Sequence, residues 1–329
     1  MVATLASALV HCAARTAPDA ASPSPPSTVV AESARPATTG SRAAPELELL
    51  RALPLQTIDD FQPSGLALYR GHLLTVSDRH DSDVFELLLG SDRVNRRSFA
   101  HFAPPGDESP PLDFEGVSAD GEALLVVSER HFRVLRVQLE PPEQGRAPGA
   151  AKARWLTESL ETRGHEAGLF QKQNANFEGL VRLSSGALLL AAEREPRGLM
   201  QLDADLSEGS GRTWAMPSSA YAVPAERAAD FCDLATTGGR VYALVRNAHL
   251  IVELHGTPNG YREGAAWSYA AAENAPEFAY ADPRFGLAEG LAIGEREIFV
   301  VLDNNAQARR AFPEDRRPLL FVFKRPPEL

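Results

Sequence analysis

The feature that most constrains the fold of this chain is a motif that occurs five times. Each copy opens with a short apolar segment around Gly-Leu, Gly-Val or Asp-Leu, and 13 to 15 residues later a second apolar segment ends at a charged or polar pair. The position just before the Gly or Asp is used to count the repeat, and it holds Ser64, Glu115, Glu178, Cys232 and Glu289. Consecutive copies of this position are 51, 63, 54 and 57 residues apart. A repeat of this length is typical of an array of equivalent supersecondary units.

The second repeat shows the unit most clearly. Its pattern predicts a first strand at 115–118 and, after the turn residues Asp120-Gly121, a second strand at 123–128. Asp-Gly between two apolar segments is a strong signal for a tight hairpin, because the turn requires positive φ. A third strand is predicted at 132–139 and a fourth at 152–160. Four-stranded antiparallel sheets repeated around an axis form a β-propeller.

The fifth repeat supplies only three strands of its own, at 290–293, 297–302 and 319–324. The apolar segment 47–55 precedes the first repeat and has no place within it. Pairing 47–55 with 321–323 would close the ring and remove two exposed sheet edges. We therefore predict an all-β chain that folds as a five-bladed β-propeller. Six blades are the alternative, and a β-sandwich would not account for the regular repeat.

The segment before the propeller has a different composition. Residues 13–45 are rich in Ala, Pro, Ser and Thr and contain no aromatic residue, which predicts a disordered tether. Within residues 1–12, Leu9-Val10-His11-Cys12 resembles a lipobox, although His11 stands where a small residue is expected. One interpretation is an export or lipoprotein signal with a lipid anchor at Cys12 and a periplasmic or extracellular protein. The other is a cytoplasmic tail. The propeller domain is expected to span 46–329.

Composition excludes several classes of partner. The net charge of -11 disfavours nucleic acid, whose phosphates would be repelled. The two cysteines, Cys12 and Cys232, predict no disulfide framework, and no apolar run is long enough for a transmembrane helix. We expect a monomer that binds cations or a small molecule.

Residues at equivalent repeat positions in a propeller form rings around its channel. One predicted ring contains Glu115, Glu178 and Glu289, with Ser64 and Cys232 in the other two places, and Asp233 stands one position later, where it can replace the missing carboxylate. A second ring, at the end of the neighbouring strand, contains Asp78, Glu129, Glu193, Arg246 and Asp303. Three arginines directly follow it, namely Arg79, Arg130 and Arg194.

Carboxylates that converge on one axis repel one another unless arginines, protons or a metal neutralise them. Oxygen ligands without a Cys/His cluster favour Ca²⁺ over a transition metal. The predicted calcium ligands are Glu115, Glu178, Asp233, Glu289 and Asp303. The residues predicted to bind an anionic substrate are Arg79, Arg130, Arg194 and Arg246. His80 and His131 follow two of the acid–arginine pairs and are candidates for acid or base catalysis.

Four passages together resemble the phytase-esterase-like propeller family. They are Ser64-Gly65-Leu66 with Val76-Ser77-Asp78-Arg79, Asp113-Phe114-Glu115-Gly116 with Ser128-Glu129-Arg130, Asn176-Phe177-Glu178-Gly179-Leu180 with Glu193-Arg194, and Ala288-Glu289-Gly290-Leu291 with Asp303-Asn304-Asn305. The resemblance covers residues 47–325 and implies hydrolysis of an ester or phosphoester. The fourth repeat departs from it at Cys232 and Arg246-Asn247. A more distant resemblance is to calcium-dependent lactonase propellers.

Three functional hypotheses follow. The first is a calcium-dependent hydrolase of a small ester, lactone or phosphoester. The second is a non-enzymatic, calcium-stabilised binding module. The third is a channel that is closed by Glu–Arg pairs and holds no metal.

Overall fold

The computed structural model describes residues 42–56, 61–106, 111–139, 151–207, 209–281 and 284–329. The predicted signal segment 1–12 with Cys12, and the tether up to residue 41, lie outside the described residues. None of the helices in the described ranges is long and apolar enough to cross a membrane.

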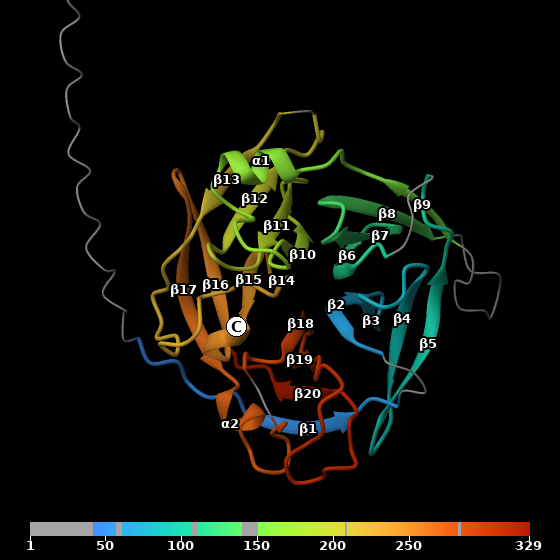
Figure 1. Cartoon of the computed structure of the whole chain (residues 1–329), viewed down its shortest axis with the longest axis vertical. Helices are drawn as coiled ribbons and strands as arrows, with labels where there is room; N and C mark the ends of the chain where they lie inside the picture. Colours follow the sequence, from blue (N-terminus) through green and yellow to red (C-terminus); the bar gives the residue numbers. More distant parts are fainter. Residues whose placement is uncertain (1–41, 57–60, 107–110, 140–150, 208, 282–283) are drawn as a thin grey trace, which may run out of the picture. The chain divides into compact units, whose positions relative to one another are not determined.

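The described residues form five four-stranded antiparallel sheets, each with its strands in the order predicted for a propeller blade (Figure 1). Blade 1 contains β2 (Pro63–Tyr69), β3 (His72–Ser77), β4 (Asp83–Leu89) and β5 (Val94–His101). Blade 2 contains β6 (Phe114–Asp120), β7 (Ala123–Ser128), β8 (Arg133–Leu139) and β9 (Ala151–Trp155). Blade 3 contains β10 (Phe177–Arg182), β11 (Leu188–Ala192), β12 (Gly198–Leu202) and β13 (Arg212–Ala215).

Blade 4 contains β14 (Asp233–Thr237), β15 (Arg240–Val245), β16 (Leu250–Thr257) and β17 (Gly260–Ser268). Blade 5 contains β18 (Ala288–Ile293), β19 (Glu297–Leu302), β20 (Leu319–Lys324) and, as its outermost strand, β1 (Leu49–Pro54). The short helices α1 (Glu161–Glu166), α2 (Ala270–Glu273) and η1 (Arg246–Ala248) lie in the connections. The prediction of five blades is confirmed.

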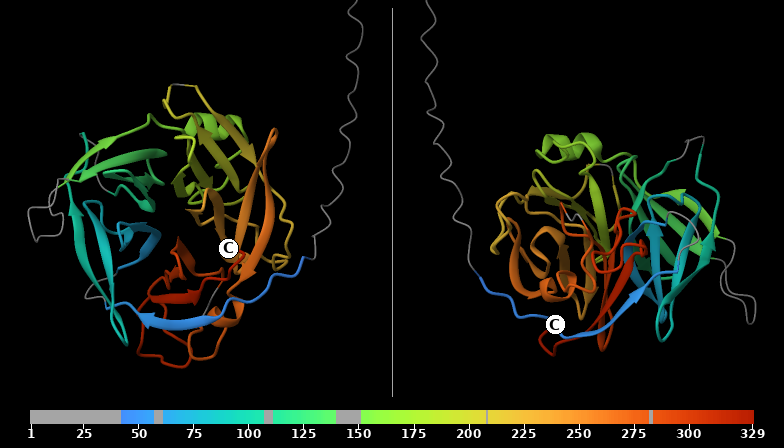
Figure 2. Two further views of the ribbon diagram at one scale, coloured as in Figure 1. Left: turned by 180° about the vertical axis from the view of Figure 1, so that it is seen from behind. Right: turned by 60° about the horizontal axis from the view of Figure 1, so that its bottom comes forward.

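The ring closes as predicted, because β1 pairs antiparallel with β20 and places Ala52 opposite Phe321. In Figures 1 and 2, β1 lies in blue along the outer side of the red blade 5. The same segment also contacts the two neighbouring blades. The backbone N–H of Leu47 donates to the carbonyl of Ser268 in blade 4 at 2.8 Å, and that of Gln56 donates to Val94 in blade 1 at 2.8 Å. One segment of about ten residues therefore ties three blades together.

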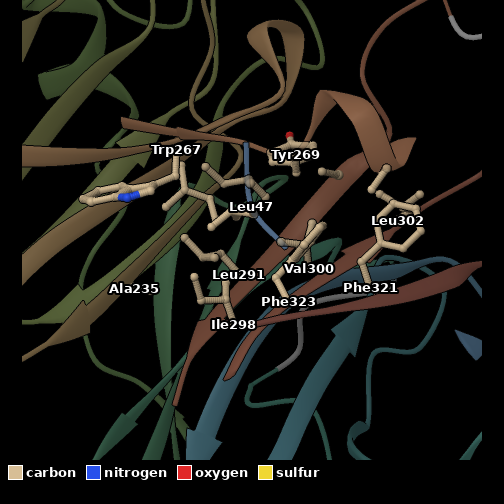
Figure 3. Close-up of a cluster of buried hydrophobic side chains, with 14 of the residues drawn as sticks. Leu47, Ala235, Trp267, Tyr269, Leu291, Ile298, Val300, Leu302, Phe321 and Phe323 are labelled. Carbon is tan, nitrogen blue, oxygen red and sulfur yellow. The ribbon is translucent and has the colours of Figure 1, made fainter. Parts of the chain in front are cut away.

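The core lies between neighbouring sheets. Figure 3 shows the apolar cluster between blades 4 and 5, where Trp267 and Leu291 lie together with Phe321 and Phe323 from β20. Burial of this kind contributes roughly 25 cal/mol per Å² of apolar surface. Trp155, Trp214 and Trp267 lie on the fourth strands of their blades, as predicted.

The repeated glycine is explained by the close approach of the inner strands. A Cβ on Gly116 would lie 2.6 Å from the carbonyl oxygen of Glu178, and a Cβ on Gly65 would lie 2.7 Å from that of Glu115. Gly179 and Gly290 meet the backbone of the next blade at 2.7 and 2.8 Å in the same way. Since no side chain fits at these positions, glycine allows the inner strands of blades 1, 2, 3 and 5 to approach the next blade this closely.

Candidate functional site

The glutamates of the inner ring are placed by β-bulges. In blade 2, Phe114 pairs with Ser128 and Gly116 with Val127, so Glu115 is an extra residue without a partner in the ladder. The register shifts at the same place around Glu178 in blade 3 and Glu289 in blade 5. A bulge leaves one residue unpaired and changes the direction of its side chain. The three predicted ring glutamates therefore leave the sheets and line a shared cavity.

The second ring lies directly after the second strand of each blade, as the spacing predicted. Its members line the same cavity of about 750 Å³. Eight carboxylates and four arginines of the described chain line it, namely Asp78, Asp113, Glu115, Glu129, Glu178, Glu193, Glu289 and Asp303, and Arg79, Arg194, Arg246 and Arg284. With every group ionised, the acids outnumber the arginines two to one.

The arginines do not neutralise this cavity evenly. The guanidinium of Arg246 contacts Glu193 through Nη2 and Glu289 through Nη1, and its Nε lies 3.3 Å from Asp230 Oδ2. Arg194 also pairs with Glu193. Arg246 is largely withdrawn from solvent, with 11% of its side chain exposed. The side of the cavity formed by blades 3, 4 and 5 therefore has its own cations, and Arg246 is placed to hold three carboxylates.

The side formed by blade 2 has a different character. Asp113, Glu115 and Glu129 each place one carboxylate oxygen within 4.8 Å of the other two. At that distance two carboxylates repel each other by roughly 3 kcal/mol if both are ionised, taking an effective dielectric constant of 20. Two oxygens on opposite sides of a calcium ion are at most about 4.8 Å apart, because Ca–O distances are about 2.4 Å. The three residues therefore have the ligand type that Ca²⁺ prefers and lie close enough together to share one ion.

Glu178 lies in the same cavity and is 7% exposed. No residue of the described chain donates a hydrogen bond to its carboxylate. Burial disfavours the charge of a carboxylate unless a partner compensates. Glu178 therefore adds to the carboxylates of this cavity whose charge is unfavourable.

Burial and mutual repulsion change the acidity of these groups. Burial, followed by the charges of Asp113 and Glu129, raises the pKa of Glu115 well above its usual range. Burial, followed by the charges of Glu115 and Glu289, raises the pKa of Glu178 in the same direction. Burial raises the pKa of Glu289 to about 8, although Arg246 opposes this shift.

Glu129 also has a structural contact. Its Oε1 accepts a hydrogen bond from the backbone N–H of Asn176 at 2.9 Å, which joins blade 2 to blade 3. A cation bound at Asp113, Glu115 and Glu129 would therefore sit on a link between blades.

Asp233, predicted as a calcium ligand, occupies a different environment. It is fully buried, and its Oδ2 accepts hydrogen bonds from the backbone N–H groups of Leu66 at 3.0 Å and Leu291 at 2.8 Å. Its Oδ1 accepts from the N–H of Leu234 at 2.8 Å. The carboxylate thus joins the inner strands of blades 1, 4 and 5 at the axis, and it does not contribute to the lining of the cavity.

The two histidines also lie outside the cavity lining. His80 packs on the rings of Phe61 and Phe85, with centroid separations of 5.6 and 5.2 Å. His131 packs on Trp155 at 5.7 Å. Both rings are held in aromatic contacts, so the structure brings neither of them together with the carboxylates.

The arginines predicted to bind substrate have different exposures. Arg79 lines the cavity with 55% of its side chain exposed, and Arg130 is exposed. Arg194 is 14% exposed, and its guanidinium lies 5.5 Å from the ring of Phe285. Of Arg79, Arg194 and Arg246, Arg79 is therefore the most exposed, whereas Arg194 pairs with Glu193 and Arg246 contacts three carboxylates.

Sequence reasoning missed Asp113 and Asp230 as members of the site. Both stand two positions before the ring residue of their repeat, ahead of Phe114-Glu115 and Phe231-Cys232. An alignment of the five repeats would have shown these two residues, because both are aspartates at the same repeat position. Asp303 and Asp78 line the cavity at the places that the spacing predicted.

No family model matches the sequence, and no curated protein is significantly similar to it. Solved structures with a similar chain path include the glutaminyl cyclase of Myxococcus xanthus, with a TM-score of 0.48 and 14% identity over 85% of this chain and 100% of that one. Another is the aldose sugar dehydrogenase of Streptomyces coelicolor in its PQQ-bound form, with a TM-score of 0.46 and 11% identity over 86% of this chain and 100% of that one. Similarities at this level carry no information about the chemistry of this chain.

Proposed function

We propose that this chain is an exported, calcium-binding β-propeller of the phytase-esterase-like type, and that it hydrolyses a small ester or phosphoester in its channel. The observation that carries the proposal is the group of three carboxylates, Asp113, Glu115 and Glu129, with their oxygens within 4.8 Å of one another in the cavity that Glu178 also lines. Carboxylates this close together repel one another, and a bound cation would offset that repulsion.

The residues of the chain suit the binding of an anionic substrate next to such a cation. Bound calcium would supply a Lewis acid that polarises a substrate oxygen. Arg79 and Arg194 at the mouth of the cavity are placed to donate hydrogen bonds to a phosphate or carboxylate group. Asp78, which lines the cavity on the adjacent blade, is the group that we assign to take a proton from an attacking water.

The test combines calcium binding with turnover. Isothermal titration of the purified protein with Ca²⁺ should show a saturable site, and hydrolysis of aryl esters, lactones or phosphomonoesters should require calcium and stop with a chelator. Glu115→Gln should weaken calcium binding at least tenfold, since it removes one of three anionic ligands. Glu122→Gln is the matched control, because the Glu122 side chain is 71% exposed. A protein that binds calcium but turns over none of these substrates would refute the hydrolase.

The second candidate is a non-enzymatic, calcium-stabilised binding module. The hydrogen bond from Asn176 N–H to Glu129 favours it, because that contact shows one of the same carboxylates joining two blades. Calcium at a hundredfold excess over Kd would then add about 2.7 kcal/mol to the free energy of unfolding. If Glu115→Gln removes this stabilisation and an assayed turnover is unchanged, the carboxylates serve structure. If turnover collapses and the melting temperature stays the same, they serve catalysis.

A further inference from the structure

Arg246 occupies a position that is acidic on every other blade. The residue that directly follows the second strand is Asp78 in blade 1, Glu129 in blade 2, Glu193 in blade 3 and Asp303 in blade 5. Blade 4 also replaces the ring glutamate with Cys232. Blade 4 therefore supplies one positive charge where blades 2, 3 and 5 each supply two carboxylates.

The contacts of Arg246 are those of a bound cation. Its guanidinium contacts one oxygen of Glu193 and one of Glu289, and its Nε lies 3.3 Å from Asp230. The second oxygens of Glu193 and Glu289 are buried and have no hydrogen-bond partner in the described part of the chain. The Glu193 side chain is only 1% exposed, so water compensates little of its charge.

These contacts define a second group of carboxylates around Arg246, of which Glu193 and Glu289 line the same cavity. The carboxylates around Arg246 come from Glu193 in blade 3, Glu289 in blade 5 and Asp230 just before blade 4, whereas Asp113, Glu115 and Glu129 all belong to blade 2 or its approach. Around Glu115 the strongest charged neighbours are all acids, namely Asp78, Asp113, Glu129 and Glu289. Arg246 thus makes its direct contacts in one of the two groups, with Glu193, Glu289 and Asp230.

We infer that the Arg246 guanidinium is a resident cation that occupies a second metal position, so that the channel takes one divalent cation instead of two. This inference rests on the proposed cation site at Asp113, Glu115 and Glu129. Removing the charge of Arg246 would leave Glu193, Glu289 and Asp230 without the guanidinium that contacts them now. These three carboxylates would then hold a second ion.

The test is the number of cations bound per chain, measured by calorimetric titration with Ca²⁺ and by terbium luminescence. The natural protein should bind one cation. Arg246→Gln, which removes the charge and keeps a side chain able to form hydrogen bonds, should bind two. Arg246→Lys keeps the charge and should bind one. The double variant Arg246→Gln/Glu289→Gln removes a ligand of the new site and should return to one.

The outcomes test the proposed function and the inference about Arg246 separately. If the natural protein binds no cation, the proposed function is wrong. If the natural protein and Arg246→Gln both bind one, the proposed site stands and the inference about Arg246 is overturned. Arg246→Gln should fold in millimolar calcium and lose its fold when a chelator is added. If it stays unfolded with calcium while Arg246→Lys folds, the inference is also overturned, because calcium does not replace the guanidinium.

Discussion

At the scale of single residues, the Glu-Gly pair combines two separate requirements. The glycine is needed because the backbone of the next blade lies where a Cβ would be, at 2.6 Å for Gly116. The glutamate is directed into the channel because it is the extra residue of a β-bulge. The sequence showed that both residues recur. It did not show the reason, because the bulge depends on the register of two strands and the close approach depends on a neighbouring blade.

Replacement of Gly116 tests the first requirement. Gly116→Ala should lower the free energy of unfolding by about 3 kcal/mol, because the added methyl group meets backbone atoms that cannot move independently. Denaturant unfolding measures the change. Gly256→Ala is the matched control, since the nearest atom to its Cβ is Tyr261 Cε1 at 4.0 Å. If Gly116→Ala lowers the free energy of unfolding no more than Gly256→Ala does, the backbone of the next blade does not limit the side chain at Gly116.

The candidate site was only partly predictable from residue types. Glu115, Glu178, Glu289 and Asp303 line the cavity, as the repeat indicated. Arg246 was expected to bind substrate, but its contacts with Glu193, Glu289 and Asp230 depend on which blades face each other across the channel. A sequence identifies an arginine among acids and does not show which of them it neutralises.

At the scale of elements, β1 closes the ring and contacts three blades. Closure was predictable, because the fifth repeat lacked one strand and 47–55 had no other place. The contacts of Leu47 with blade 4 and Gln56 with blade 1 were not predictable, since they involve single residues beyond the strand ends.

Truncation of a buried side chain in β1 tests how much this strand stabilises the ring. Leu53 is 3% exposed, and Leu53→Ala should lower the free energy of unfolding by about 2–5 kcal/mol. Leu50 in the same strand is 45% exposed, and Leu50→Ala should change the free energy of unfolding by less than about 0.5 kcal/mol. Equal effects of the two substitutions in denaturant unfolding would show that β1 does not pack as described.

The connection between β19 and β20 contains an ion pair whose stability should depend on pH. Arg317 donates to both oxygens of Asp315, at 2.8 and 2.7 Å, and Arg309 also contacts this carboxylate. The hydrogen bonds from Arg317 lower the pKa of Asp315 from its ordinary value of 3.8. A lowered pKa in the folded state stabilises the protein above pH 3.8, and this contribution is lost as the pH falls further.

Asp315→Asn should therefore be less stable than the natural protein at pH 7, by about 2 kcal/mol, because charged hydrogen bonds are lost. The difference in melting temperature should shrink as the pH falls below about 4. The exposed neighbour Glu314 provides a control, and Glu314→Gln should behave like the natural protein at every pH. If the difference in melting temperature between Asp315→Asn and the natural protein stays constant down to pH 2, this explanation is wrong.

At the scale of the whole molecule, the channel is divided by charge. Arg246 contacts carboxylates from blades 3 and 5, whereas Asp113, Glu115 and Glu129 form a close group of acids at blade 2. The sequence already predicts that the rings are asymmetric, with Ser64 and Cys232 in the first ring and Arg246 in the second. The structure adds that Arg246 contacts Glu193 and Glu289, while the close group of three carboxylates lies at blade 2.

The most direct test of this account is a crystal structure determined with calcium present and a second one with terbium, whose anomalous scattering identifies the ion. The account predicts one metal peak that is coordinated by Asp113, Glu115 and Glu129, with Arg246 still bound to Glu193 and Glu289. A channel with no metal peak would contradict it, and so would a peak on the axis between Glu193 and Glu289 with Arg246 displaced.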